Sequence, residues 1–304
     1  VLDDDIVLST GASMFLFGGN VLLHGTEEQK LRYLPRIASG EAVGCWALTE
    51  PEAGSDALGI RTRATRDGDH FVIRGRKTFI TNAPIADCFI VMTRSAWEPG
   101  EIMGGTAFVL ERGLPGLSTG KPFEKMGMRC SPTGEIFLDD VRVHESCRLG
   151  PEGMGFLGMM QSLDVERAVA GAINLGIAQA CLDISIAYAR ERQQFGRPLA
   201  AFQLVQAKIA RMYRDLELGR AYLLHVLELA QAGERVTAEA SVSKWFSAEV
   251  GTQVALEAIQ ILGGNGYCRE YKVERYLRDA KLLEIGAGTN EINALLIAKL
   301  LLGR

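Results

Sequence analysis

The hydrophobic and polar positions of the chain change their spacing twice between its ends. In residues 1–38, apolar side chains such as Ile6, Met14 and Phe15 recur at helical spacing, which predicts an amphipathic helical segment. Thr26 stands directly before acidic residues in this segment, a pattern typical of a helix N-cap. Because the chain opens inside a helical pattern and without an initiator methionine, we expect it to be a fragment of a longer protein.

From about residue 41 to residue 150 the apolar runs are short and closely spaced, with no helix-length insert between them. Asp67-Gly68 separates two of these runs, and this dipeptide is a strong hairpin signal. The pattern favours an antiparallel β-barrel or sandwich over a parallel sheet. The expected strands are 43–48, 60–65, 70–73, 77–81, 88–93, 106–110 and 135–138.

From about residue 154 onward the pattern is helical to the end of the chain. After Arg167 no charged residue occurs until Asp183, and a helix that is apolar on all sides is buried among other helices. Long helices joined by short links form a bundle. The expected helices are 155–191, 201–232, 237–262, 270–279 and 289–302.

These patterns predict an α+β multi-domain protein. We expect residues 1–40 to be the remainder of an N-terminal helical domain, residues 41–150 a middle β domain, and residues 151–304 a C-terminal four-helix bundle. With 304 residues, 47% of them hydrophobic, the chain is long enough for a large core and for about two domains.

Charge and cysteine usage argue against several classes of protein. The net charge of −4 does not suit nucleic-acid binding, which needs a basic face. No apolar run reaches the roughly 18 residues of a membrane span. The six cysteines and four histidines are scattered without metal-ligand spacing, which argues against a zinc site and for a reducing compartment, not secretion.

Two glycine motifs have simpler explanations than the chemistry they suggest. Residues 153–158 match G-x-G-x-x-G, but a dinucleotide site needs a second parallel strand about 20 residues on, where this chain continues a helix. Residues 116–120 match G-x-S-x-G, but Pro115 and Pro122 place them in a loop, away from any strand-to-helix elbow. We interpret the first as the entry to a helix and the second as a loop.

Two segments of the β region carry candidate chemistry. In residues 48–56 (LTEPEAGSD) a glycine allows close backbone approach, and hydroxyls suit a polar or anionic ligand. Taken alone, this segment is a turn, and residues 77–83 (KTFITNA) are a strand. Together, in this order and spacing, they resemble the T-E-P-x-x-G-S-D and W/F-I-T-N motifs of the acyl-CoA dehydrogenase family.

Further segments extend the resemblance over nearly the whole chain. Residues 125–133 resemble M-G-x-R-x-S-x-T, residues 190–196 resemble R-x-x-F-G, and residues 260–292 resemble the C-terminal signature of the family. The resemblance implies FAD as cofactor, an acyl-CoA substrate and electron-transfer flavoprotein as electron acceptor. The FAD-binding residues that it implies are Leu48, Thr49, Gly54, Ser55, Phe79, Ile80, Thr81, Arg192, Phe195, Gln260, Gly263, Gly264, Thr289 and Glu291.

Some of these positions contact the FAD of a neighbouring subunit in the family. They are matched here by Arg192, Phe195 and the loop around Gln260. The resemblance therefore implies a homodimer at least, and we expect a homotetramer. It also implies the cytoplasm of a bacterium or the mitochondrial matrix of a eukaryote as the compartment.

The reaction of the family removes the α-proton of an acyl-CoA thioester while the β-hydrogen leaves as hydride, and it needs a carboxylate base in a dry site. Most members place this glutamate where the present chain has Ala287, which cannot take a proton. Glu166, just before Arg167, resembles the base of a branch that includes isovaleryl-CoA and long-chain acyl-CoA dehydrogenases. An arbitrary glutamate here would be an exposed first-turn residue, and Asp164 is the nearest competitor for the role.

Three positions bear on the substrate. The resemblance implies that Arg167 lies beside the substrate and that the backbone N–H of Ala287 binds the thioester oxygen. Gly286 replaces a tyrosine of many straight-chain members, which favours a short or branched acyl group, unless the glycine only serves a turn. The alternatives are an acyl-CoA oxidase, a flavin monooxygenase of the same architecture, or an inactive truncated scaffold.

Overall fold

The computed structural model describes residues 4–95 and 103–303. Its internal contacts divide the chain into two compact units. Unit one consists of Val1–Lys125 and Arg129–Leu163, and unit two of Met126–Met128 and Asp164–Arg304. The N-terminal helices and the strands therefore share unit one, and the three-part division expected from the sequence stays a prediction.

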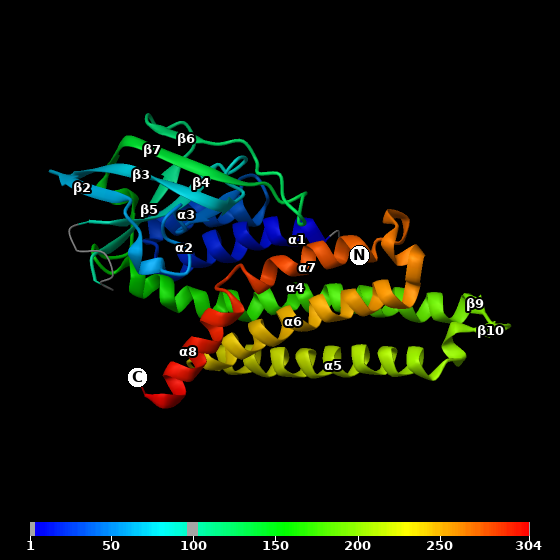
Figure 1. Cartoon of the computed structure of the whole chain (residues 1–304). Helices are drawn as coiled ribbons and strands as arrows, with labels where there is room; N and C mark the ends of the chain where they lie inside the picture. The colour runs from blue at the N-terminus through cyan, green and yellow to red at the C-terminus, as the bar shows by residue number, and fades with distance from the viewer. Residues whose placement is uncertain (1–3, 96–102, 304) are drawn as a thin grey trace. The chain divides into compact units, whose positions relative to one another are not determined.

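The strands of unit one lie side by side in one sheet (Figure 1). Their order is β6-β7-β3-β2-β4-β5-β8, and β1 pairs with β4. Most pairings are antiparallel, as expected, but β1 runs parallel to β4 and β2 meets β4 in one parallel residue pair. The parallel pairing is feasible because the β2–β3 hairpin and a long turn separate β1 from β4 along the chain. The strands are β1 (Gly44–Ala47), β2 (Arg63–Asp67), β3 (His70–Thr81), β4 (Cys88–Arg94), β5 (Gly105–Glu111), β6 (Leu117–Thr119), β7 (Thr133–His144) and β8 (Arg148–Leu149).

Several strands differ from their expected bounds. The runs 70–73 and 77–81 form one strand, β3, because two register shifts against β7 absorb the irregular residues between them. The run 135–138 is only the middle of β7. Residues 117–119 form strand β6, so the expectation of a loop at the G-x-S-x-G motif is wrong, although no helix follows it to make an elbow.

Strand β4 lies at the centre of the core and is buried along its whole length. Its side chains alternate between the two faces of the sheet, as the period of two requires. Ile90 and Met92 pack in a cluster with Phe17 and Val21 of the N-terminal helices. Phe89 and Val91 pack on the opposite face, in a cluster that includes Phe71 and Phe108.

The described part of the N-terminal segment, from Asp4 to Ala38, is largely helical, as predicted, and residues 1–3 of the prediction lie outside the described residues. Thr26 caps the third helix in a capping box: Gln29 N–H donates to Thr26 Oγ1 at 3.2 Å, and Thr26 N–H donates to Gln29 Oε1 at 3.1 Å. This arrangement satisfies two of the amide groups that a helix start leaves free. The elements are α1 (Asp4–Gly11), the π-helix η1 (Ala12–Gly18), α2 (Gly19–His24) and α3 (Glu27–Ala38).

Unit two is helical, and its helix bounds fall within four residues of the predicted ones. It contains the greater part of α4 (Gly155–Glu191), with α5 (Gln203–Gln231), α6 (Thr237–Leu262), α7 (Val273–Ala280) and α8 (Asn290–Leu302). A hairpin of β9 (Gln193–Gln194) and β10 (Arg197–Pro198) follows α4. The short 3₁₀ segments of the chain are η2 (Ala57–Gly59), η3 (Glu145–Cys147), η4 (Leu199–Ala201), η5 (Gly263–Tyr267), η6 (Arg269–Tyr271) and η7 (Lys281–Glu284).

Small residues bring α4 and α6 close together. A Cβ added at Gly171 would lie 3.2 Å from Ser247 Oγ, and one added at Gly251 would lie 2.8 Å from Asn174 Cβ. Asn174 Nδ2 donates to the carbonyl oxygens of Ala248, at 3.1 Å, and Ala280, at 3.2 Å. The glycines therefore allow a close helix pair that one buried amide side chain ties to α7.

The expectation that no segment is long and apolar enough to span a membrane needs a correction. Ile6–His24 and Gly155–Glu191 both meet that criterion by length and composition. Their most apolar windows are 33% and 50% buried within the protein. Core helices of proteins outside membranes meet the same criterion, so these helices are weak evidence for a membrane location.

Candidate active site

Glu166 lies on α4 in unit two, and its environment is unusual for a glutamate. The residue is half-buried, but its carboxylate Oε2 is fully buried and has no hydrogen-bond partner among the described residues. Burial raises the pKa of Glu166 to about 7, while the positive charges of Arg167 and Lys244 oppose a further rise. A carboxylate in this state can take up and release a proton near neutral pH.

Asp164, the competing carboxylate, is engaged in other contacts. Thr237 Oγ1 donates a hydrogen bond to Asp164 Oδ2 at 2.5 Å, and Arg167 Nη1 lies 3.5 Å from Asp164 Oδ1. Burial lowers the pKa of Arg167, which is 9% exposed, and its two carboxylate neighbours Asp164 and Glu166 partly restore it. Asp164 therefore holds Arg167 and Thr237, and Glu166 is left as the unpaired carboxylate of this helix turn.

Ala287, the position at which the resemblance implies the base of most family members, lies beside the same helix. Ala170, Ala248 and Leu283 form a buried cluster, against which Ala287 packs. Ala170 is one helical turn after Glu166, so the two side chains share a face of α4. Positions 166 and 287, far apart in the sequence, thus belong to one neighbourhood within unit two.

The segment that contains Ala287 has a constrained backbone. Ala287 has a φ of 54° and Gly288 a φ of 82°, so both lie in the left-handed region. An alanine in this region costs about 1 kcal/mol or more, and surrounding contacts must hold it there. Lys244 Nζ donates to the Gly288 carbonyl at 2.6 Å, and Asn293 Nδ2 donates to the same oxygen at 2.9 Å.

The candidate residues of unit one also gather, around the turn after β1. Lys77 Nζ donates to the Leu48 carbonyl at 2.9 Å and to Glu50 Oε1 at 2.7 Å, and the backbone of Thr78 donates to the Thr49 carbonyl at 2.9 Å. These contacts join the two β-region motifs that the sequence singled out. Phe79 follows at a register shift of β3, with a φ of 56° and a ring that is 68% exposed.

The remaining residues of that segment differ in exposure. Ile80 is buried, Thr81 is half-buried, and Gly54 and Ser55 are exposed. A Cβ added at Gly54 meets no described atom within 4 Å, so packing within the chain does not require glycine there.

A second group of candidate residues in unit two lies far from Glu166. Arg192 and Phe195 follow the end of α4, which is about 37 Å from Glu166 at the rise of a straight helix. Near that end, Asn265 Nδ2 donates to the Tyr188 hydroxyl at 2.8 Å, which brings the glycine loop of η5 to the same region. The exposed residues here are Arg192, Phe195, Gln260, Gly263 and Gly264. They cannot serve the Glu166 site of the same subunit.

The last two candidate residues begin α8. Thr289 caps this helix by accepting a hydrogen bond from Ile292 N–H at 3.2 Å, and Glu291 is exposed in its first turn. Gly286 is half-buried, and a Cβ added to it would meet only the Leu282 carbonyl oxygen, at 3.5 Å.

Sequence reasoning missed Lys244, Asn293 and the role of Lys77. Lys244 left one signal in the sequence, because it is a cation among small and apolar residues of α6. Asn293 and Lys77 gave no comparable signal, since their contacts depend on a turn geometry that the sequence does not reveal.

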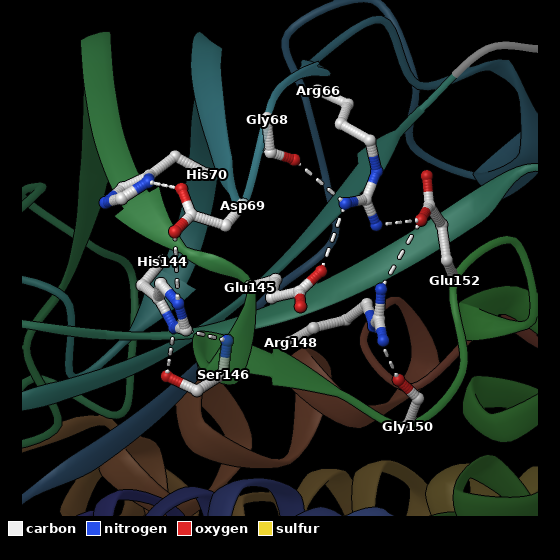
Figure 2. Close-up of polar contacts among 10 residues, drawn as sticks. All are labelled: Arg66, Gly68, Asp69, His70, His144, Glu145, Ser146, Arg148, Gly150 and Glu152. Atoms are coloured by element: carbon white, nitrogen blue, oxygen red, sulfur yellow. Dashed lines mark hydrogen bonds and ion pairs between the residues drawn. The ribbon is translucent and has the colours of Figure 1, made fainter.

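A polar cluster in unit one joins the β2–β3 hairpin to the end of β7 and has a structural explanation (Figure 2). Asp69 contacts both His70 and His144, and Ser146 Oγ lies 2.9 Å from His144 Nδ1. These residues form a serine–histidine–aspartate set, but His144 Nδ1 also accepts the Ser146 N–H at 3.2 Å and so caps η3. Asp69 is 3.8 Å from His144 Nε2, and the three side chains are exposed. Nor do the described residues contain a cluster of three or more metal-ligating side chains.

Comparisons with known proteins agree with this picture. Residues 45–141 match the family model of the acyl-CoA dehydrogenase middle domain, and residues 153–302 match that of the C-terminal domain. The mitochondrial isovaleryl-CoA dehydrogenase of Oryza sativa subsp. japonica is 43% identical over 96% of this chain and 71% of its own length. An acyl-CoA dehydrogenase of Bacillus subtilis is 42% identical over 98% of this chain and 78% of its own length.

Solved structures share the fold across both units. Butyryl-CoA dehydrogenase of Megasphaera elsdenii matches 99% of this chain and 78% of its own chain, with a TM-score of 0.96 and 38% identity. A chain from a structural study of the electron transferring flavoprotein of Acidaminococcus fermentans has the same TM-score and identity, covering 99% of this chain and 79% of its own. The prolyl acyl carrier protein oxidase AnaB matches with a TM-score of 0.95 and 37% identity, over 99% of this chain and 79% of its own.

The fold and the matched family models define a flavoprotein dehydrogenase. The chain belongs to the acyl-CoA dehydrogenase family, whose members depend on FAD. It is therefore an oxidoreductase of the acyl-CoA dehydrogenase class.

Proposed function

We propose that this enzyme converts a short or branched acyl-CoA thioester into the trans-2-enoyl-CoA, with Glu166 as the base that removes the α-proton. The observation that carries this proposal is the unpaired, fully buried Oε2 of Glu166, and burial raises the pKa of this carboxylate to about 7. A base of this pKa is largely ionised at slightly alkaline pH and holds the abstracted proton without a large energetic penalty.

The proton transfer needs stabilisation of the negative charge that develops on the thioester oxygen. The backbone N–H of Ala287 is our candidate donor, because the left-handed turn is fixed by Lys244 and Asn293 at the next residue. A backbone donor does not depend on the side chain, so alanine at this position is compatible with catalysis. Arg167 is adjacent to the base and held by Asp164, and we propose that it adds positive charge beside the substrate thioester.

Bound FAD supplies the acceptor for the β-hydride. The residues of unit one that would hold FAD are Leu48, Thr49, Gly54, Ser55, Phe79, Ile80 and Thr81. The open space around Gly54 and the exposed side chain of Phe79 fit a flat ligand that packs on this segment. In unit two Thr289 and Glu291 are our candidates for contacts with the nucleotide end of an FAD molecule. The open space beside Gly263 and Gly264 suits a ligand from another subunit.

The acyl group is inferred from position 286. Gly286 projects no side chain, and a Cβ there would have room on all sides but one. This space, together with the isovaleryl-CoA dehydrogenase of Oryza sativa as a relative at 43% identity, favours a short branched acyl group such as isovaleryl.

The separation of Arg192 and Phe195 from Glu166 within unit two supports a proposal about assembly. Phe195 is 93% exposed beside Arg192, about 37 Å along α4 from the base. Such an exposed aromatic residue suits an interface, and we propose a homodimer or homotetramer in which this group contacts the FAD of a neighbouring subunit. Electron-transfer flavoprotein is the proposed acceptor, and the bacterial cytoplasm or the mitochondrial matrix is the proposed compartment.

An oxidase reaction is the second candidate, favoured by the likeness to the oxidase AnaB. The two reactions share the proton abstraction and differ in whether the reduced flavin passes electrons to oxygen. Oxygen consumption by the reduced protein separates them.

The test is anaerobic bleaching of the flavin absorbance by a panel of isovaleryl-CoA, butyryl-CoA and palmitoyl-CoA, using the FAD-loaded protein. We expect isovaleryl-CoA or a similar short thioester to bleach the flavin fastest, with slow reoxidation in air and fast reoxidation by electron-transfer flavoprotein. Flavin that stays oxidised with every thioester would contradict the proposed function, and fast reoxidation by air alone would favour the oxidase.

A further inference from the structure

Lys244 is the one charged residue that α6 buries, and it is 1% exposed. Burying an ammonium group is costly unless it is well paired. Its Nζ donates to the Gly288 carbonyl at 2.6 Å and lies 3.4 Å from Asn290 Oδ1. An ammonium has three N–H donors, and the third has no hydrogen-bond acceptor among the described residues.

The position of Lys244 on α6 places it near both Ala287 and Glu166. Ala248, one helical turn further along α6, belongs to the buried cluster that packs against Ala287 and contains Ala170. Ala170 in turn follows Glu166 by one turn of α4. The lysine therefore lies next to the turn that contains Ala287 and in the neighbourhood of the base.

We propose that Lys244 is a positioning residue of the active site, which fixes the turn at Ala287 through the Gly288 carbonyl and keeps Glu166 ionisable through its positive charge. This inference rests on the proposed function for Glu166. It assigns two separable roles to one side chain, because the hydrogen bond needs only a donor whereas the effect on Glu166 needs a charge.

The charged groups around this pair explain why the lysine matters. Burial raises the pKa of Glu166, and the positive charges of Arg167, on its own helix, and of Lys244, on α6, oppose this rise. Burial and the positive charge of Arg167 lower the pKa of Lys244 to about 8. The negative charges of Glu284, Glu166 and Glu291 oppose this decrease. Lys244 is therefore mostly protonated at pH 7. Both of the positive charges that oppose the rise in the pKa of Glu166 are then present.

Three substitutions separate the two roles. Lys244→Gln keeps a donor for the Gly288 carbonyl but removes the charge, Lys244→Arg keeps the charge, and Lys244→Met removes both. Lys208→Gln is the matched control, because Lys208 forms a half-exposed ion pair with Glu257 on the surface of α5 and α6. All four variants are prepared with FAD bound.

The first readout is the infrared carboxyl band of Glu166, identified by its loss in Glu166→Gln and titrated against pH without substrate. We expect the midpoint to rise by about one pH unit in Lys244→Gln and Lys244→Met, and to stay near that of the wild type in Lys244→Arg and Lys208→Gln. A midpoint unchanged in Lys244→Gln would overturn the role of the charge.

The second readout is flavin reduction by the thioester that bleaches the wild type. Lys244→Gln should react about fivefold more slowly at pH 7 and recover at higher pH, with a KM near that of the wild type. Lys244→Met should also raise KM, because the turn at Ala287 is released. Equal KM values for the two variants would overturn the role of the hydrogen bond. Wild-type flavin that no thioester reduces would refute the proposed function instead, and the infrared titration would still decide whether Lys244 acts on Glu166.

Discussion

Two glutamates with buried carboxylate oxygens, one in each unit, differ in how those oxygens are paired and therefore in their pKa. Glu50 is 5% exposed and accepts hydrogen bonds from Lys77 Nζ and from the backbone N–H groups of Arg61 and Thr62. Burial alone would raise the pKa of Glu50, but the ion pair and hydrogen bonds outweigh it and lower the pKa. Glu166 lacks a hydrogen bond at Oε2, and burial raises its pKa to about 7.

The difference separates a structural carboxylate from the one that we propose as the base. Glu50 fixes the turn that carries Leu48 and Thr49, and its ionised form is fully satisfied. Glu166 has nearby positive charge but no hydrogen bond to hold its buried oxygen, so both protonation states are accessible near pH 7. Each unit also uses a buried lysine to hold a backbone carbonyl beside its candidate site, Lys77 at Leu48 and Lys244 at Gly288.

The largest expected effect is the loss of flavin reduction in Glu166→Gln. Removing the base should slow anaerobic bleaching by a thioester roughly 10³- to 10⁴-fold, because no other group takes the α-proton. FAD content and thermal stability serve to show that the protein is intact. Glu249→Gln, on the exposed face of α6, is the control and should keep the rate of the wild type. A normal rate in Glu166→Gln would transfer the role to Asp164 or another residue.

The next effect concerns stability and should come from Glu50→Gln. This change leaves the ammonium of Lys77 buried without its partner, and we expect it to lower the free energy of unfolding by roughly 3–5 kcal/mol. Glu27→Gln breaks the exposed ion pair with Lys30 and should cost less than about 0.5 kcal/mol. Urea unfolding of both variants measures the contrast, and similar small losses would mean that the buried pair contributes little.

The two glutamates should also give opposite pH dependence of stability. The pKa of Glu166 is about 7 in the folded state, against an ordinary value of 4.5. Between these two pH values the folded state binds more protons than the unfolded state. The contribution of Glu166 to stability is therefore lost as the pH rises from 4.5 to about 7. Glu166→Gln should therefore match the wild type near pH 4.5 and exceed it by about 2–3 kcal/mol above pH 8. The lowered pKa of Glu50 has the reverse sign, and its contribution is lost as pH falls below 4.5.

Unfolding free energies measured between pH 4.5 and 8.5 test this sign directly. Glu166→Gln should diverge from the wild type as the pH rises, while Glu50→Gln should converge with it only at the acid end. A constant difference between Glu166→Gln and the wild type over the whole range would show that Glu166 titrates normally.

The smallest effect is a partial rescue by moving the carboxylate. Ala287 packs against the cluster that contains Ala170, one turn from Glu166. In the double variant Glu166→Gln with Ala287→Glu, we expect flavin reduction to regain about tenfold over Glu166→Gln alone, since the new carboxylate lies in the same neighbourhood but in an unoptimised geometry. Rescue by Ala287→Gln instead would show that the carboxylate is not the cause.

The helices were well predicted because their patterns are long, whereas the sheet depended on contacts that sequence patterns do not reveal. The uncharged stretch after Arg167 correctly indicated α4 as a long helix from 155 to 191. The parallel pairing of β1 with β4 and the fusion of two runs into β3 were not predicted, because they arise from a crossover and from bulges. The two-residue strands β8, β9 and β10 are too short to show a pattern.

The candidate site was only partly readable from the sequence. Glu166 was predicted from its place at the entry to an apolar helix and from the resemblance, and the structure adds a buried, unpaired oxygen that supports the proposed role. The separation of Arg192 and Phe195 from Glu166 follows from helix length, which the sequence already contained. Lys244 was missed because a single lysine on a helix is usually solvated, and only the turn at Gly288 explains its burial.

The most direct measurement is the rate of single-turnover flavin reduction as a function of pH, with the wild type beside Glu166→Gln. The wild-type rate should rise with pH through an apparent pKa near 7, and the variant should be slow at every pH with no such rise. A variant that keeps both the rate and the pH profile of the wild type would contradict the assignment of Glu166 as the base.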